Sequence, residues 1–326
     1  MSGPLPAGPD GPGPAPLPRG FEVGHFTDLD AATGCTVILA PESGAVGGCE
    51  VRGGGPGTRE TDLLSPAAPS RPIAAVVFTG GSAHGLAAAG EAAEVLSERG
   101  RGHRTKLGHL VPLVPAAVVY DMALGADARP GPGAARAAID AASADPARGT
   151  VGAGTGCSIG KLLGPEHLTK GGVGLASEDV GGCRVAALAV VNAIGEVLAE
   201  DGSVLAGPWR DGRYHHTVDV LRAGESPAML TDREATTLVC VMTDAVLDRV
   251  GAWMLARAAT TGCARAVDPT ATQFDGDACF VLAAGEAEAD PLTLQAIVPH
   301  VVAAAIRDAA RQATSLGGVD AIRDRA

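Results

Sequence analysis

Short apolar runs and longer amphipathic stretches make up most of the chain, and turn-forming residues separate them. The short runs have the length of strands and predict strands at residues 36–40, 73–79, 114–120, 184–199, 236–243 and 278–284. The longer stretches are rich in alanine and predict helices at residues 84–99, 132–144, 245–264 and 292–312. Because strands and helices do not alternate strictly, a doubly wound parallel sheet is not expected.

Four segments fall outside this pattern. Residues 43–70 and the glycine-rich residues 149–174 predict loops, and the second of these is expected to be tightly folded. Residues 201–232 are polar with two Asp-Gly turn signals, so they predict a linker that leads to the strand at 236–243. Residues 1–20 are rich in Pro and Gly without a cationic segment followed by an apolar one, which predicts a disordered tail rather than a signal peptide.

Composition and charge narrow the class of protein. The chain has 326 residues, enough for one large domain or two small ones. Its net charge is −12 and its basic residues form no cluster, so a nucleic-acid partner is not expected. The mean hydropathy is only +0.19. No apolar run approaches the roughly 20 residues that a membrane helix needs, so a membrane partner is not expected either.

The cysteines and histidines give no sign of a metal site. Seven cysteines are scattered along the chain, and no pair has the spacing of a metal knuckle. Most lie in apolar surroundings, which predicts buried, reduced thiols in a cytoplasmic protein. None of the eight histidines has ligand spacing, so neither a metal nor a cofactor is expected.

Two adjacent threonines, Thr236 and Thr237, open the apolar run at 236–243. A threonine at this place usually reflects the preference of β-branched residues for strands. If the bond before Thr236 is cut, however, the hydroxyl lies beside a free α-amine, whose ordinary pKa of roughly 8 suits a general base. This is the N-terminal-threonine form of nucleophilic catalysis. Thr237 remains an alternative, and its side chain would point to the opposite face of the strand.

Two carboxylates and an amide are candidate partners for this nucleophile. Asp275 and Asp277 lie two residues apart before the strand at 278–284, so in an extended chain both face one side. Their repulsion would raise the pKa of one of them, and such a pair can accept protons from Thr236. The alternative is a plain Asp-Gly turn. Asn192, inside an apolar run, is either an oxyanion-hole donor or an amide satisfied by the backbone.

Lys161 is one of only three lysines and follows a glycine-rich loop. A cation there can stabilise an oxyanion or lower the pKa of the Thr236 amine; the alternative is a surface lysine. The loop is not a phosphate-binding loop, because Leu162 stands where Ser or Thr is required. A dinucleotide-binding fingerprint fails as well, because Cys157 replaces its third glycine.

Two further residues have weaker signals. Ser82 lies in a near-copy of the nucleophile elbow, but His84 replaces the second glycine, so Ser82 is predicted to cap a helix or to form part of a pocket wall. Tyr120 can line the substrate pocket or pack in the core.

The glycine-rich blocks and the candidate residues together resemble a known family. This is the DmpA-type family of self-cleaving L-aminopeptidase/D-esterases, β-peptidyl aminopeptidases and nylon-oligomer hydrolases. Single glycine-rich blocks are weak signals, but here they follow the family's order between about residues 21 and 286. The matching blocks are residues 53–62, 78–86, 111–117, 151–156, 160–164, 170–172, 191–195 and 274–277.

The resemblance implies an α/β fold of the α+β kind: a four-layer αββα sandwich with two stacked sheets between helices. It also implies a single catalytic domain, 21–326, that cleaves itself between Ala235 and Thr236 into fragments 21–235 and 236–326. By resemblance, Asp275 and Asp277 partner the nucleophile and Asn192 supplies an oxyanion-hole donor. Many relatives have Asn before the nucleophile where this chain has Ala235, but the attacked group is a backbone carbonyl, and the related ornithine acetyltransferases cleave an Ala-Thr bond.

The function implied is hydrolysis of amide or ester bonds in short peptides or amino-acid amides, through an acyl-enzyme. The resemblance also implies a homo-oligomer, with a tetramer expected. Endo-hydrolysis of nylon oligomers is the nearest alternative. By resemblance, a Thr rather than Ser nucleophile favours it, and so does the set Lys161, Asn192, Asp275 and Asp277. Acyl transfer to another acceptor and an unprocessed, non-catalytic scaffold, at which Ala235 hints, are the remaining alternatives.

Overall fold

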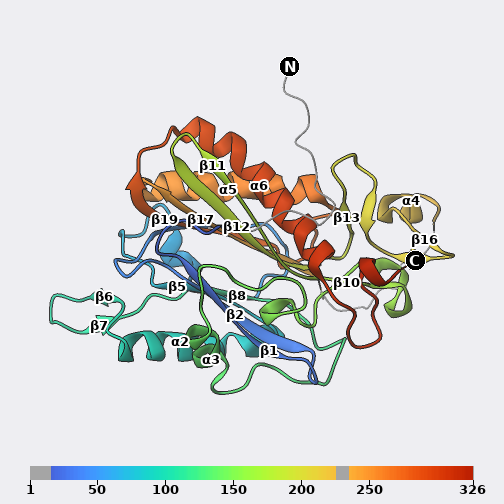
Figure 1. Ribbon diagram of the computed structural model, residues 1–326, viewed down its shortest axis with the longest axis horizontal. Helices are drawn as coiled ribbons and strands as arrows, with labels where there is room; N and C mark the ends of the chain where they lie inside the picture. The colour runs from blue at the N-terminus through green and yellow to red at the C-terminus, as the bar shows by residue number, and fades with distance from the viewer. Residues whose placement is uncertain (1–15, 225–234, 326) are drawn as a thin grey trace.

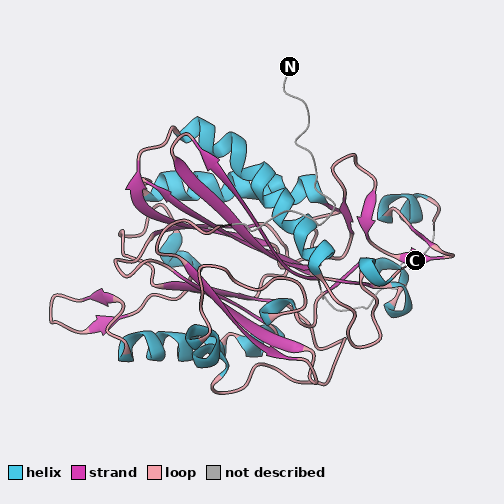
Figure 2. Cartoon of the chain, in the orientation of Figure 1, coloured by secondary structure: helices cyan, strands magenta, loops and turns pink. Residues whose placement is uncertain are grey.

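The computed structural model describes residues 16–224 and 235–325 as four layers, with two stacked sheets between two layers of helices (Figures 1 and 2). The first sheet has the order β1 (Glu22–Asp28), β2 (Thr33–Leu39), β5 (Ala75–Thr79), β8 (Ala116–Val118) and β4 (Thr58–Arg59). The second sheet has the order β11 (Gly172–Val180), β12 (Cys183–Asn192), β17 (Thr236–Ala245), β19 (Ala278–Ala287) and β3 (Val46–Val51). The predicted αββα sandwich is confirmed.

Four helices cover the outer faces of the sheets. Helices α5 (Arg249–Ala266) and α6 (Pro291–Gln312) lie on the second sheet, and α2 (Ala87–Glu98) and α3 (Ala134–Asp140) lie on the first (Figure 1). The two long helices start at aspartates: the side chain of Asp248 accepts the Gly251 N–H, and that of Asp290 accepts the Thr293 N–H. Each aspartate therefore satisfies a backbone donor that the first helical turn leaves open.

Alternation of side chains along β17 divides the apolar residues between two cores. Leu238, Cys240 and Met242 are buried between the two sheets, whereas Val239 and Val241 are buried under α5 and α6. A third core lies between the first sheet and helices α2 and α3. A strand buried on both faces reads as a continuous apolar run, which is why the sequence marks β17 so clearly.

Several predicted loops contain regular structure. Residues 43–70 hold β3, β4 and the 3-10 helix η1 (Thr61–Leu64), so the loop prediction is wrong there. Strand β3 was hidden by its two glycines: a Cβ at Gly48 would lie 2.4 Å from the backbone of Ala252, so helix α5 can approach the strand only because no side chain intervenes. The strand predicted at 184–199 is divided into β12 and β13 (Glu196–Leu198).

The polar segment predicted as a linker is also structured up to residue 222. It contains β14 (Val204–Ala206), β15 (Trp209–Arg210), β16 (Arg213–Tyr214) and α4 (Thr217–Arg222); its last residues lie outside the described part of the chain. Most of the predicted Pro/Gly-rich tail likewise lies outside it, but Leu17 is buried against the core between the sheets, so ordered structure begins before residue 21.

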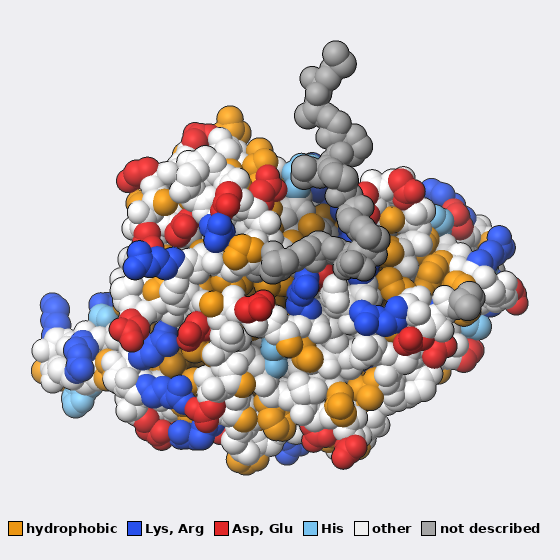
Figure 3. Space-filling view, viewed as in Figure 1, with side chains coloured by type: hydrophobic (Ala, Val, Ile, Leu, Met, Phe, Trp, Pro, Cys, Tyr) orange, Lys and Arg blue, Asp and Glu red, His pale blue; other side chains and the backbone are white. Residues whose placement is uncertain are grey.

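Short elements complete the fold. They are α1 (Ser82–Gly85), β6 (His103–Arg104), β7 (Leu110–Val111), η2 (Gly152–Gly154), β9 (Ser158–Ile159), η3 (Lys161–Leu163), η4 (Pro165–His167), β10 (Thr169–Lys170), β18 (Val267–Asp268) and η5 (Ile322–Asp324). On the face in Figure 3, basic and acidic side chains are interspersed. In the described residues, no helix has both the length and the apolar character needed to cross a bilayer.

A glycine on β11 provides a test of this packing. A Cβ at Gly174 would lie 2.1 Å from the Ala305 carbonyl oxygen of α6. We therefore expect Gly174→Ala to lower the free energy of unfolding by about 1–3 kcal/mol, because helix and strand must separate. Gly131 is the matched control, since a Cβ there meets nothing within 4 Å. Urea unfolding that places Gly174→Ala level with Gly131→Ala would contradict this packing.

Candidate active site

Thr236 and Asn192 lie opposite each other at one end of the neighbouring strands β17 and β12 of the second sheet. Thr236 begins β17, Asn192 ends β12, and the two residues are partners in the antiparallel register. By alternation Thr236 shares the face of Leu238, between the two sheets, whereas Thr237 shares the face of Val239, under the helices. Both threonines are buried, but they belong to different layers.

The carbonyl oxygen of Ala235 lies at the centre of the site. The Thr236 hydroxyl donates to it at 2.6 Å, and the Gly276 N–H donates to it at 2.8 Å. Gly276 comes this close because it has no side chain: a Cβ there would lie 2.8 Å from Thr236 Oγ1. Two donors therefore converge on the carbonyl that precedes Thr236.

The two carboxylates are held by the loop that leads into β19. Oδ2 of Asp277 accepts from Thr270 Oγ1 at 2.6 Å and from the Ala271 N–H at 2.8 Å, while Oδ1 accepts the Thr237 N–H at 2.6 Å. Oδ2 of Asp275 accepts from both the N–H and the hydroxyl of Thr272, at 2.8 and 2.6 Å. Asp277 therefore ties this loop to the start of β17.

Burial controls the protonation of this pair. Burial, and after it the negative charge of Asp277, raises the pKa of Asp275 to about 6, against hydrogen bonds from Thr272 and the positive charge of Lys161. Burial also raises the pKa of Asp277, against hydrogen bonds from its three donors. The raised pKa predicted for a crowded pair is confirmed. For Asp275, desolvation is the larger cause and repulsion by Asp277 the smaller.

Asn192 connects three segments of the site. Its Oδ1 accepts from Lys161 Nζ at 2.8 Å and from the Ser158 N–H at 3.0 Å, and its Nδ2 donates to the Tyr120 carbonyl oxygen at 2.9 Å. Lys161 is only 7% exposed, so the alternative of a surface lysine is wrong. Tyr120 contacts the site through its backbone, and a role for its ring in substrate binding stays a prediction.

Comparison with known proteins identifies the family. The model of peptidase family S58 matches residues 19–323. The chain belongs to peptidase family S58. It is therefore a hydrolase that acts on amide bonds, as the resemblance implied.

The proteins similar in sequence to this chain include two kinds of named protein. An uncharacterized aminopeptidase of Mycobacterium leprae is 40% identical over 294 residues, spanning 83% of this chain and 78% of the relative. A 6-aminohexanoate-oligomer endohydrolase of Paenarthrobacter ureafaciens is 29% identical over 274 residues, spanning 82% of this chain and 74% of the relative.

Solved structures share the fold. A β-aminopeptidase from Burkholderia sp. matches with a TM-score of 0.69 at 23% identity, covering 95% of this chain and 92% of its own. An L-aminopeptidase D-Ala-esterase/amidase from Ochrobactrum anthropi, described as a variant of the Ntn hydrolase fold, matches with a TM-score of 0.69 at 20% identity, covering 94% and 89%.

Sequence reasoning assigned no role to the buried supports of this S58 site. Lys170 Nζ donates to the carbonyl oxygens of Gly154, Cys157 and Gly171 at 3.1, 2.9 and 2.8 Å, and burial lowers its pKa to about 8. It thus holds the glycine-rich loop that positions Lys161. The scarcity of lysine in this chain was the available signal.

Asp121 is a second missed support. Its carboxylate accepts from Thr33 Oγ1 at 2.6 Å and from the Gly81 N–H at 2.7 Å, and burial raises its pKa against the positive charge of Lys161. The predicted cap at Ser82 is wrong, because Gly81 occupies the N-cap position and Ser82 is already helical. In the described residues, no group of three or more His, Cys, Asp or Glu is placed to hold a metal ion.

The raised pKa of Asp275 predicts a pH-dependent stability. A carboxyl with a raised folded-state pKa stabilises the fold below about pH 4, and this contribution is lost as pH rises through about 6. In a Thr236→Ala background, the stability of Asp275→Asn relative to its parent should therefore rise as pH increases from 4 to 7, by up to about 3 kcal/mol.

Urea unfolding across this pH range measures the difference. Asp201→Asn is a control of opposite sign, because hydrogen bonds from Ser203 lower the pKa of that exposed carboxyl. Its relative stability should fall slightly as pH rises. A constant difference between Asp275→Asn and its parent would show that the carboxyl titrates normally.

Proposed function

We propose that this S58 peptidase matures by cutting its own Ala235–Thr236 bond and then uses Thr236 as an N-terminal nucleophile on short peptides or amino-acid amides. The observation that carries the proposal is the pair of donors on the Ala235 carbonyl oxygen. The Thr236 hydroxyl lies beside this carbonyl, and the Gly276 N–H polarises it. The two fragments would be 21–235 and 236–326.

The maturation step begins with attack of Thr236 Oγ1 on the Ala235 carbonyl carbon. The negative charge that develops on the carbonyl oxygen is stabilised by the Gly276 N–H, as in an oxyanion hole. A carboxylate of the Asp275/Asp277 pair takes the hydroxyl proton and returns it to the departing amide nitrogen. The resulting ester is hydrolysed by water, which leaves the Ala235 carboxylate and a free Thr236 α-amine.

The free amine then serves as general base for the Thr236 hydroxyl. A carboxylate pair whose pKa lies closer to neutrality than usual can exchange protons with that amine. Lys161, held by Asn192, supplies positive charge beside the site and supports the oxyanion of the substrate. Attack on a substrate amide gives an acyl-enzyme on Thr236, which water then hydrolyses.

The fragments have a physical reason to stay together after the cut. Strand β17 would belong to the small fragment, yet its register with β12 of the large fragment runs from Val185↔Thr243 to Asn192↔Thr236. Both faces of β17 are buried. Self-association of the processed protein into a tetramer is also part of the proposal.

An aminopeptidase-like activity is the first candidate, because the more similar of the two relatives described above is named an aminopeptidase. Endo-hydrolysis of 6-aminohexanoate oligomers is the second. It is favoured by a relative with that name. It is also favoured by the resemblance of Thr236, the two carboxylates and the Lys161–Asn192 pair to the nylon-hydrolase arrangement.

Maturation is tested on the purified protein by a denaturing gel and an intact mass of each band. We expect two fragments that meet between Ala235 and Thr236. Thr236→Ala should stay whole because it lacks the attacking hydroxyl. Thr237→Ala is the matched control and should still be cut, because its side chain lies on the helix face of the strand.

Gly276→Ala offers a second test of the same geometry. Its new methyl group would displace the Thr236 hydroxyl, so cutting should slow by at least about tenfold, while the distant Gly131→Ala cuts normally. A wild-type chain that stays whole on incubation would reject self-processing, and a cut before Thr237 would move the nucleophile by one residue.

Substrate class is tested with paired 6-aminohexanoate oligomers and short peptides, each with a free or an acetylated amino terminus. The aminopeptidase-like candidate predicts that acetylation lowers kcat/KM by about 100-fold or more, because a desolvated amine contact is lost. Equal cleavage of free and blocked oligomers would instead favour endo-hydrolysis. Thr236→Ala should be inactive on all of them.

A further inference from the structure

A cavity lies on the helix side of the second sheet, between α5 and the start of β19. Its volume is about 340 Å³, and it is lined by residues of α5, β19 and the loop between them, among them Thr260, Cys263, Thr270, Asp277 and Cys279. Asp277 therefore has two neighbours. Its Oδ1 accepts the N–H of Thr237 at the start of β17, and the residue also lines this cavity.

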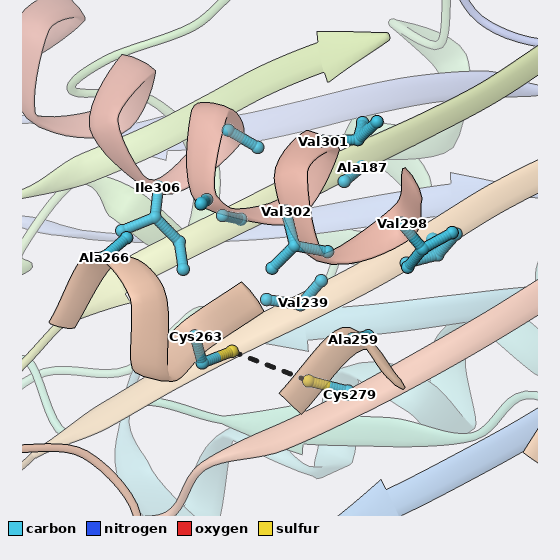
Figure 4. Close-up of a cluster of buried hydrophobic side chains, with 14 of the residues drawn as sticks. Ala187, Val239, Ala259, Cys263, Ala266, Cys279, Val298, Val301, Val302 and Ile306 are labelled. Atoms are coloured by element: carbon cyan, nitrogen blue, oxygen red, sulfur yellow. Dashed lines mark hydrogen bonds between the residues drawn. The ribbon is translucent and has the colours of Figure 1, made fainter. Parts of the chain in front are cut away.

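Two cysteines of the cavity wall face each other. Cys263 lies in the last turn of α5 and Cys279 is the second residue of β19, and their sulfur atoms are 3.7 Å apart (Figure 4). A disulfide needs about 2.0 Å between the sulfurs, so the remaining gap is within reach of side-chain rotation and a small shift of the helix. Both thiols are free in this structure.

The segment between these cysteines holds the carboxylates of the site. Residues 264–278 include Asp275 and Asp277 together with their donors Thr270, Ala271 and Thr272. A bond between Cys263 and Cys279 would close this segment into a ring and restrict its freedom in the unfolded chain.

We propose that Cys263 and Cys279 form a reversible redox site, in which a hydroperoxide that enters the cavity converts the two thiols into a disulfide. One thiolate attacks the peroxide, the O–O bond breaks, and a sulfenic acid and water form. The second thiol then attacks the oxidised sulfur and releases another water. Two thiols and one hydrogen peroxide thus give one disulfide and two water molecules.

Oxidation of this cysteine pair is expected to be slow. The hydrogen bond between Cys279 and Cys263, together with burial, raises the pKa of Cys279 well above its usual value, so the reactive thiolate is scarce. The disulfide stabilises the loop that carries the carboxylates. Its formation does not depend on whether Thr236 is the nucleophile.

The experiment treats the full-length protein with hydrogen peroxide, blocks free thiols and maps tryptic peptides without reduction. Cleavage after Arg257, Arg265 and Arg307 places one cysteine in residues 258–265 and the other in residues 266–307. We expect these two peptides joined, at a mass two hydrogens below their sum, and separated again by dithiothreitol. Tm should rise by about 5 °C on oxidation and fall back on reduction.

Cys263→Ala and Cys279→Ala should each lose the joined peptide and the rise in Tm, whereas Cys183→Ala, at the far end of β12, should keep both. Wild-type peptides that stay separate, with thiols intact or oxidised singly to sulfinic acids, would overturn the proposal even if a variant fails to fold. A joined peptide without any change in Tm would overturn the stabilising role.

Discussion

The parallel pairing of β17 with β19 is the constraint on which the site depends. Leu238 lies beside Ala278 in this register, and because the strands run in the same direction, the residues before each strand meet at one edge of the sheet. That brings Ala235 and Thr236 to the loop that carries Asp275 and Asp277, which are distant in sequence. The parallel pairing continues before the regular strands, where Ala235 pairs with Asp275 and the Gly276 N–H donates to the Ala235 carbonyl oxygen.

Burial then determines the chemistry at this edge. Carboxylates removed from water prefer to hold a proton, and this cost is offset by directed donors rather than by one strong ion pair. Asp277 receives three such donors, one of them from β17 itself. The same bonds that make burial of Asp277 tolerable therefore also position the strand that carries Thr236, so stability and alignment are difficult to separate here.

Sequence alone predicts those elements whose pattern of apolar residues matches the way they are buried in the fold. Strand β17 is apolar on both faces, and α6 has a clear helical spacing, so both are found within a few residues. Strand β3 was missed because its glycines serve the close approach of α5, a tertiary requirement that leaves no local signal. The candidate residues were found largely through ordered motifs. The Gly276 donor was not, because a backbone N–H has no identity in sequence and only a fold can aim it.

The two faces of β17 explain how one strand can serve unrelated purposes. The side chain of Thr236 faces the space between the sheets, and Thr237 and Val239 face the helices, where α5 brings Cys263 to Cys279. Asp277 links the start of β17 to this helix side, since it contacts the Thr237 N–H and also lines the cavity of the thiols. A change on the helix face can therefore act on both carboxylates, because the loop between α5 and β19 carries donors to each of them.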